Sequence, residues 1–206
     1  MFKEIKSLCE ELEKEFDQIT PERKKHLLAL SLFFQKKFKA KETAKAIVIC
    51  THNSRRSHLG QLWLSVGAEH FGLPKVESFS GGTEATAFNP RAVSAAKKAG
   101  FKIEADDPKA TNPIYSVCWN DEMNPYQAFS KKFDDTPNPT TDFAAIMVCT
   151  SADEGCPFVS GNTFRIALPY DDPKAFDDTD LEAAKYTERL RQIGREVLWM
   201  FSMVKV

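Results

Sequence analysis

The sequence predicts an α/β protein with three layers, in which helices cover both faces of a four-stranded parallel sheet. A helical extension precedes this core and a β-hairpin is inserted into it. Short apolar runs rich in β-branched residues are typical of strands buried on both faces of a sheet. Amphipathic segments with helical spacing alternate with those runs, and this alternation indicates a parallel sheet.

Two helices are predicted before the first strand. Residues 2–19 repeat apolar side chains at steps of three and four. Thr20 and Pro21 are typical of the N-cap and first turn of a second helix, which is predicted to run to about Phe38. This helix carries too many apolar residues for one buried stripe. We therefore expect residues 1–40 to form a helical extension whose surplus apolar residues pack on the main body or form a homo-oligomer contact.

Residues 41–206 are expected to form the main domain. Its predicted strands are Ala44–Cys50, Lys75–Ser80, Phe143–Cys149 and Phe164–Leu168, and its predicted helices are 57–71, 90–100 and 179–204. The segment at about 104–142 breaks this alternation. Two β-prone stretches there flank the turn-rich sequence NDEMN, which predicts an inserted β-hairpin.

The composition excludes several classes of function. The 206 residues are 42% hydrophobic and 28% charged, with a formal net charge of -1, so no bulk field attracts nucleic acid. No uncharged apolar run approaches the ~20 residues that span a bilayer. Residues 1–16 are acidic and amphipathic, unlike a signal peptide. We therefore expect a cytoplasmic protein with no membrane or nucleic-acid partner.

The sharpest motif joins the first strand to the next helix. Cys50 ends the strand, five residues follow, and Arg56 and Ser57 open the helix. In open α/β sheets ligands bind beyond the carboxyl ends of the strands, where Cys50 is expected. Successive backbone N–H groups of such a loop can enclose a tetrahedral anion, and the helix N-terminus adds further donors. The motif therefore predicts an oxyanion site.

The side chains of this motif suit that interpretation. Arg56 offers a planar fork for two anion oxygens. Positive surroundings favour the thiolate of Cys50, which is the nucleophilic form, and Ser57 can donate a hydrogen bond to it. Asn53 tolerates the left-handed backbone that a tight loop needs. The alternative is a buried strand-end cysteine beside an ordinary arginine, because this spacing alone is common.

Three segments resemble the low-molecular-weight protein tyrosine phosphatase superfamily: residues 45–64, SGGTEATAFNPRAV at 80–93, and CTSADEGCP at 149–157. Within it they are most similar to the thioredoxin-coupled arsenate reductases. The resemblance spans about residues 44–100 and 143–204. It implies a four-stranded parallel sheet, a catalytic domain over residues 41–206, and substrate-binding residues around Cys50 and Arg56, namely Thr51, His52, Asn53, Ser54, Arg55 and Ser57.

A proton donor is expected in the loop after the last predicted strand. Attack on phosphate or arsenate needs the departing oxygen to be protonated, and LPYDDPKAF supplies Asp171 and Asp172. The resemblance implies that the general acid is the aspartate before a proline, which is Asp172. The alternative is an acidic turn without a catalytic role.

Two further cysteines are candidates for redox chemistry. Cys149 ends the third predicted strand, so we expect it at the same sheet edge as Cys50, and Cys156 follows across the polar segment TSADEG. The arsenate reductases have such a pair at this spacing, which implies a thiol–disulfide relay. The alternatives are a core cysteine and a lone surface thiol. Five cysteines are an odd number, which argues against a structural disulfide framework, and no adjacent ligand completes a zinc site.

The sequence departs from the family at several positions. His52 stands where the family usually has glycine, and Arg55 where it usually has cysteine. Gln61 replaces a glutamate that the reductases associate with potassium. Lys174 and Ala175 stand where phosphatases have two tyrosines after the Asp-Pro pair, and this difference favours a reductase.

Three functions are compatible with these residues. The leading hypothesis is an arsenate reductase with a Cys50, Cys149 and Cys156 relay, whose disulfide thioredoxin reduces. The alternative enzyme is a protein tyrosine phosphatase that forms a phosphocysteine, with its aromatic cleft supplied by hairpin residues, the candidates being Tyr115, Trp119, Tyr126 and Phe129. The third is an inactive anion-binding module. The expected substrate is an arsenate or phosphate oxyanion, or phosphotyrosine, and no metal or organic cofactor is expected.

Overall fold

The computed structural model describes residues 1–74, 76–155 and 158–206. The helices are α1 (Lys3–Glu13), η1 (Phe16–Gln18), α2 (Pro21–Lys39), α3 (Arg56–His70), α4 (Pro90–Lys98), α5 (Thr150–Gly155), η2 (Pro173–Phe176) and α6 (Glu182–Ser202), where η marks a 3-10 helix. The strands are β1 (Ala44–Cys50), β2 (Val76–Gly82), β3 (Lys102–Ala105), β4 (Tyr115–Cys118), β5 (Tyr126–Ala128), β6 (Phe143–Met147) and β7 (Asn162–Ala167).

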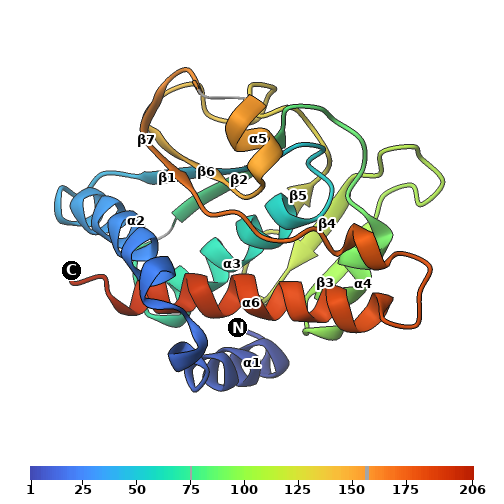
Figure 1. Ribbon diagram of the computed structural model, residues 1–206, viewed down its shortest axis with the longest axis horizontal. Coiled ribbons are helices and arrows are strands. Elements are labelled where there is room, and N and C mark those ends of the chain that lie inside the picture. The colour runs from blue at the N-terminus through green and yellow to red at the C-terminus, as the bar shows by residue number, and fades with distance from the viewer. Residues whose placement is uncertain (75, 156–157) are drawn as a thin grey trace.

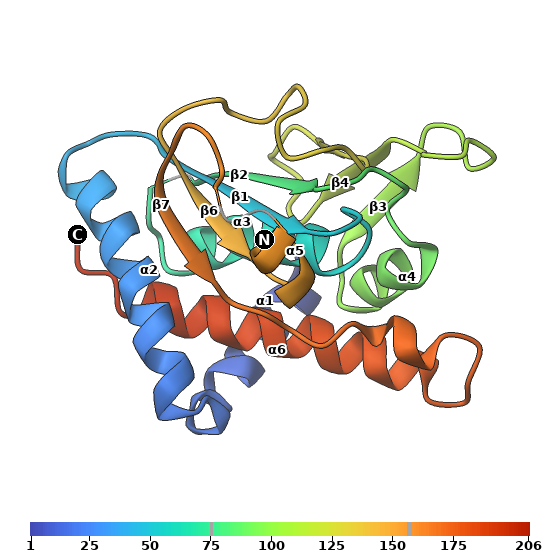
Figure 2. The ribbon, with the colours of Figure 1, turned by 45° about the horizontal axis from the view of Figure 1, so that its top comes forward.

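Four strands form one parallel sheet in the order β2-β1-β6-β7 (Figures 1 and 2). The β1–β2 register runs from Ala44 opposite Val76 to Cys50 opposite Gly82, so both strands end at the same edge. The apolar β1 sequence AKAIVIC is buried at every position except Lys45, as a central strand requires. The predicted four-stranded parallel sheet is confirmed.

Helices lie on both faces of this sheet. α3 and α6 lie on one face, and α5 lies on the other (Figure 1). Gly60 brings α3 close to the sheet, since a Cβ at this position would lie 2.9 Å from Cγ1 of Val48. The predicted three-layer arrangement is therefore confirmed.

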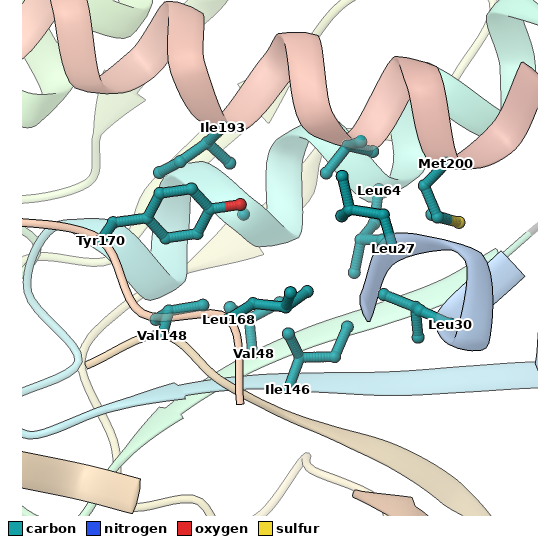
Figure 3. Close-up of a pocket in the computed structure, with 12 residues that line it drawn as sticks. Leu27, Leu30, Val48, Leu64, Ile146, Val148, Leu168, Tyr170, Ile193 and Met200 are labelled. Carbon is teal, nitrogen blue, oxygen red and sulfur yellow. The ribbon is translucent and has the colours of Figure 1, made fainter. Parts of the chain in front are cut away.

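Helix α2 contributes to the same core. Leu27 and Leu30 of α2 line a small apolar cavity of about 20 Å³ together with Val48 of β1 and Met200 of α6 (Figure 3). A void of this size between close-packed side chains belongs to the core and is too small for a substrate. The N-terminal helices therefore pack on the main body.

The outer face of α2 remains apolar in part. Leu28 is 40% exposed and Leu32 is 54% exposed. The surplus apolar residues of this helix thus divide between the core and solvent. A homo-oligomer contact through the N-terminal helices stays a prediction.

The inserted segment forms a second, antiparallel sheet. Strands β4 and β5 make the predicted hairpin, and β3 pairs with β4 to give the order β3-β4-β5. The sequence did not predict β3, because its four residues, KIEA, are too few to show a period. The hairpin is therefore one part of a three-stranded sheet.

The segment after β6 also differs from its prediction. Residues Thr150–Gly155 form the short helix α5, where the sequence predicted a polar loop. Six residues span less than two turns, so the segment carries no helical repeat that the sequence could reveal.

Candidate active site

The carboxyl edge of the parallel sheet brings the predicted site residues together. Cys50 is the last residue of β1, and Arg56 is the first residue of α3. Cys149 follows β6, the neighbour of β1, and Asp172 caps the N-terminus of η2 beyond β7. Residues far apart in sequence therefore meet where three neighbouring strands end.

The loop at residues 51–55 turns its carbonyl groups toward outside donors. Four carbonyls accept such bonds: Thr51 from Glu84 N at 2.8 Å, His52 from Thr86 Oγ1 at 3.1 Å, Asn53 from His58 Nε2 at 2.9 Å, and Ser54 from Asn89 N at 2.9 Å. Among the described residues, none accepts a hydrogen bond from the backbone N–H groups of residues 51–55. Backbone N–H groups are rarely left unpaired in folded proteins. The loop therefore offers a set of free donors to an anion.

Asn53 and Ser57 fix the nucleophile. Asn53 has a φ of 43°, the left-handed conformation expected for this position. Its amide nitrogen donates to Ser57 Oγ at 2.9 Å, and Ser57 Oγ lies 3.1 Å from Cys50 Sγ. Because an amide NH₂ only donates, the Ser57 hydroxyl accepts from Asn53 and keeps its own hydrogen for the sulfur. This hydrogen bond orients the Cys50 sulfur at the start of the loop.

Arg56 is held in place but keeps one donor free. Its guanidinium donates from one terminal nitrogen to the Tyr170 carbonyl at 2.8 Å and from the other to Asp172 at 2.7 Å. Its Nε is buried and has no hydrogen-bond partner among the described residues. An anion bound by the loop amides can take this remaining donor.

The two candidate aspartates differ in their surroundings. Asp172 contacts Arg56, and its other carboxylate oxygen accepts from Lys174 N at 3.1 Å. The Asp171 side chain is 97% exposed and lies 3.4 Å from Arg189. Of the two, Asp172 is the one that contacts Arg56, which follows the loop at residues 51–55 (the oxyanion loop), so the geometry favours it as the general acid.

The remaining loop residues have other contacts. Arg55 donates to the Tyr186 hydroxyl at 2.7 Å and to Asp177 at 3.3 Å, so its guanidinium is already occupied. His52 is exposed and lies 3.6 Å from Glu84. The roles of Thr51, His52, Ser54 and Arg55 in substrate binding stay predictions.

Cys149 lies beside the oxyanion loop. Its Sγ is 3.3 Å from Thr51 Oγ1, and Thr51 directly follows Cys50. Cys50 and Cys149 are both free thiols, each 3% exposed. Cys156, the third predicted member of the relay, lies outside the described residues.

Three residues that the sequence did not identify support the loop. Gly82 approaches it so closely that a Cβ there would lie 2.7 Å from both Thr51 O and Asn53 N. Ser130 donates to the His52 carbonyl at 3.0 Å, and Lys131 N donates to the Asn53 side-chain oxygen at 2.9 Å. Ser130 and Lys131 follow the inserted hairpin, so no local pattern connects them with the loop. Gly82 lies in the segment SGGTEATAFNPRAV, which resembles the family, and this resemblance was the available signal.

His58 is a buried, neutral histidine that also supports the loop at residues 51–55. It is fully buried, and burial lowers its pKa to about 3, with a further contribution from the charge of Lys131. Its Nε2 must carry the hydrogen that reaches the Asn53 carbonyl, because a carbonyl only accepts. Its ring stacks on Phe88 with centroids 4.0 Å apart. His58 thus positions the loop as a neutral donor.

Two of the aromatic hairpin residues lie away from the loop. Trp119 donates from its indole to Glu69 at 2.7 Å, near the end of α3. Glu69 lies thirteen positions after Arg56, which is about 20 Å along the helix. Trp119 and Tyr126 line a cavity of about 750 Å³ beside β2. The suggestion that these two residues form a cleft at Cys50 is therefore wrong, because Trp119 contacts the opposite end of α3 and Tyr126 lines the same cavity.

No group of three or more His, Cys, Asp or Glu side chains in residues 1–74, 76–155 and 158–206 is placed to hold a metal ion. Across the same ranges, the helices are too short or too polar to cross a bilayer.

Sequence comparison finds two arsenate reductases. The chain is 28% identical to the arsenate reductase of Halalkalibacterium halodurans over 150 residues, which cover 72% of this chain and 88% of that relative. It is 25% identical to the arsenate reductase of Bacillus licheniformis, with the same coverage. No protein-family profile matches the chain.

Structure comparison finds phosphatase folds. A YwlE mutant from Bacillus subtilis matches with a TM-score of 0.53 and 14% identity, over 80% of this chain and 100% of that one. The low molecular weight phosphotyrosine phosphatase of Vibrio cholerae O395 matches with a TM-score of 0.50 and 12% identity, over 77% and 95%. The chain has the low-molecular-weight phosphatase fold. The resemblance predicted from the sequence is confirmed, because the solved structures share the fold and the sequence relatives are arsenate reductases.

The inserted sheet and the two N-terminal helices lie outside the segments whose sequence resembles the low-molecular-weight phosphatase family. The sheet still reaches the site, because the chain that leaves β5 supplies Ser130 and Lys131 to the loop. The insertion therefore contributes to the loop's rigidity.

Proposed function

We propose that this protein is a thiolate enzyme for tetrahedral oxyanions and that its reaction is arsenate reduction. The position of Cys149 is the main support, because its sulfur lies 3.3 Å from the hydroxyl of the residue after Cys50. A second thiol next to the nucleophile serves a reductase, whereas a phosphatase needs only water there. The sequence similarity to arsenate reductases agrees with this choice.

The first step is attack on arsenic. The loop amides and Arg56 hold the arsenate oxygens, and the Cys50 thiolate forms a sulfur–arsenic bond. One arsenic–oxygen bond breaks, and Asp172 gives its proton to the departing oxygen, which leaves as water. The hydrogen bond from Ser57 stabilises the thiolate before attack.

The second step reduces arsenic. The Cys149 thiolate attacks the sulfur of Cys50 and forms a disulfide, while the electron pair of the sulfur–arsenic bond passes to arsenic. Arsenic(V) becomes arsenic(III) and leaves as arsenite, and two thiols are oxidised. Cys156 then attacks Cys149, which frees Cys50 and gives a Cys149–Cys156 disulfide that thioredoxin reduces by thiol–disulfide exchange.

The test is arsenate turnover with thioredoxin, thioredoxin reductase and NADPH. Wild-type protein is expected to turn over continuously, and Cys149→Ser to lose turnover by a factor on the order of 10³ or more. Cys118→Ser is the matched control, because this half-exposed thiol on β4 belongs to the other sheet. Continued arsenate reduction by Cys149→Ser would show that the relay is wrong.

The second candidate is phosphomonoester hydrolysis. The same Cys50, Arg56 and Asp172 support it, since phosphate and arsenate have nearly the same shape. Water would then resolve a phosphocysteine. Aryl phosphate hydrolysis that persists in a Cys149→Ser, Cys156→Ser double variant, with no arsenate reduction by wild-type protein, would favour this function.

A further inference from the structure

The side chain of Arg55 connects the oxyanion loop to the segment that carries Asp172. Its Nε donates to the Tyr186 hydroxyl at 2.7 Å, and a terminal nitrogen lies 3.3 Å from Asp177. Tyr186 in turn donates to the other oxygen of Asp177 at 2.7 Å. Arg55 is 9% exposed and Tyr186 is 1% exposed, so this three-residue arrangement is largely shielded from solvent.

Asp177 is coupled to Asp172 through one short helical turn. Asp177 N donates to the Lys174 carbonyl at 3.0 Å, and Lys174 N donates to the Asp172 carboxylate at 3.1 Å. The η2 turn between them has hydrogen-bonded backbone, so few of its backbone torsion angles can change. A contact that fixes Asp177 therefore also limits the positions available to Asp172.

Both ends of this turn meet the loop arginines. Asp172 lies 2.7 Å from Arg56 and 3.9 Å from Nε of Arg55, while Asp177 lies 3.3 Å from Arg55. Arg91 of α4 approaches Asp177 at 3.7 Å from the outer side. Since Asp177 balances the charge of Arg55, that guanidinium is not a free competitor of Arg56 for the oxyanion.

We propose that Arg55 is a positioning residue, which with Tyr186 and Asp177 fastens the 172–177 turn to the oxyanion loop and so sets the position of Asp172. The inference rests on the proposed function, because Asp172 needs a fixed position only if it delivers a proton to a departing oxygen. This role differs from the direct substrate binding that the sequence predicts for Arg55.

The fastening is tested by amide hydrogen exchange in three variants. Arg55→Met and Tyr186→Phe are expected to speed exchange at Lys174, Ala175 and Asp177 about tenfold or more. Arg191→Met is the matched control, since it removes ion pairs to Glu11 of α1 and to Glu15 at the start of η1, far from the 172–177 turn in sequence. Unchanged exchange in the 172–177 turn in both variants would overturn the inference without any activity being measured. Tyr186→Phe keeps the ring, so it remains informative if Arg55→Met fails to fold.

The effect on Asp172 is tested with aryl phosphates whose leaving groups differ. Phenyl phosphate needs a proton on its departing oxygen and 2,4-dinitrophenyl phosphate does not. Arg55→Met is expected to lower kcat for phenyl phosphate about tenfold and to leave the dinitrophenyl ester within about twofold. Arg55→Lys keeps the charge but not the planar guanidinium, and its kcat for phenyl phosphate is expected to lie between those of wild-type protein and Arg55→Met. Equal losses on both esters would overturn the inference.

The test is completed by combining Arg55→Met with Asp172→Asn. If Arg55 acts through Asp172, Arg55→Met causes no further loss in that background, whereas additive losses would contradict the inference. If the protein reduces arsenate but hydrolyses no aryl phosphate, the readout is the single-turnover rate at which the Cys50 thiol is lost. The effect of Arg55→Met on this rate is then compared between wild-type protein and Asp172→Asn. Wild-type protein that acts on neither arsenate nor aryl phosphates would instead refute the proposed function, and with it the role of Arg55 in catalysis.

Discussion

The carboxyl edge of the parallel sheet and the cavity beside the inserted sheet differ in how many hydrogen-bond donors they leave unpaired next to a nucleophile. The cavity is roomy, at about 750 Å³, but its Trp119 indole and Glu69 carboxylate are bonded to each other, and its buried Tyr126 hydroxyl, which has no hydrogen-bond partner among the described residues, lies beside no nucleophile. At the sheet edge, the amides of residues 51–55 and Nε of Arg56 have no partner among the described residues and lie in the loop that begins at Cys50. Unpaired donors beside a nucleophile, more than volume, therefore mark the place where chemistry is expected.

The largest effect is expected from Cys50→Ser. Both arsenate reduction and aryl phosphate hydrolysis should fall by a factor on the order of 10⁴ or more, because the nucleophile is lost. The melting temperature should change little, since serine is nearly the same size. Activity assays and thermal melts check this. If Cys50→Ser kept a tenth of the activity, the sheet edge would no longer be distinguished from the cavity as the place of the reaction.

Asp172→Asn is expected to have the next largest effect. Loss of the proton donor should lower kcat about 10²- to 10³-fold with a poor leaving group. Asp171→Asn is the matched control, and its exposed side chain predicts a change of less than about twofold. Steady-state kinetics of both variants check this. Equal losses in the two variants would contradict the assignment of Asp172.

The buried imidazole of His58 predicts acid sensitivity at the sheet edge. Its pKa of about 3 in the folded chain lies below its ordinary value of 6.5. Between these values the unfolded chain binds the extra proton, so the free energy of unfolding falls as the pH drops from 6.5 toward 3. The loss at about pH 5 should be on the order of 2 kcal/mol. Urea unfolding of wild-type protein and His58→Gln checks this, and the variant should show a smaller change with pH.

The smallest effect is expected at the cavity. Trp119→Phe removes the hydrogen bond to Glu69 and should lower the free energy of unfolding by about 1–2 kcal/mol. The value of kcat/KM for arsenate should stay within about twofold, because the contact lies near the far end of α3. Urea unfolding and steady-state kinetics check this. A large loss of activity at unchanged stability would mean that the cavity takes part in the reaction.

The sequence could predict the parts of the molecule whose signals are local. β1 is a run of apolar residues, and a parallel sheet necessarily brings the ends of its strands to one edge, so the meeting of Cys50 and Cys149 could be expected. The left-handed backbone of Asn53 followed from its side-chain type. In each case the physical reason is a pattern within one segment or the general geometry of a parallel sheet.

The parts that the sequence could not predict depend on contacts between distant segments. Ser130 reaches the His52 carbonyl across 78 positions, and no spacing rule connects them. The contacts of Arg55 with Tyr186 and Asp177 likewise join segments more than 100 positions apart. Strand β3 forms because β4 supplies a partner for its backbone, although its own four residues show no period.

The central claim is that the Cys50 thiolate attacks an oxyanion held by the loop. The most direct measurement mixes reduced protein with one equivalent of arsenate, without thioredoxin, and counts thiols and arsenite. We expect two thiols lost for each arsenite released, a Cys149–Cys156 disulfide in the peptide map, and no thiol loss in Cys50→Ser. Arsenite release with every thiol intact, or equal thiol loss in Cys50→Ser, would contradict the claim.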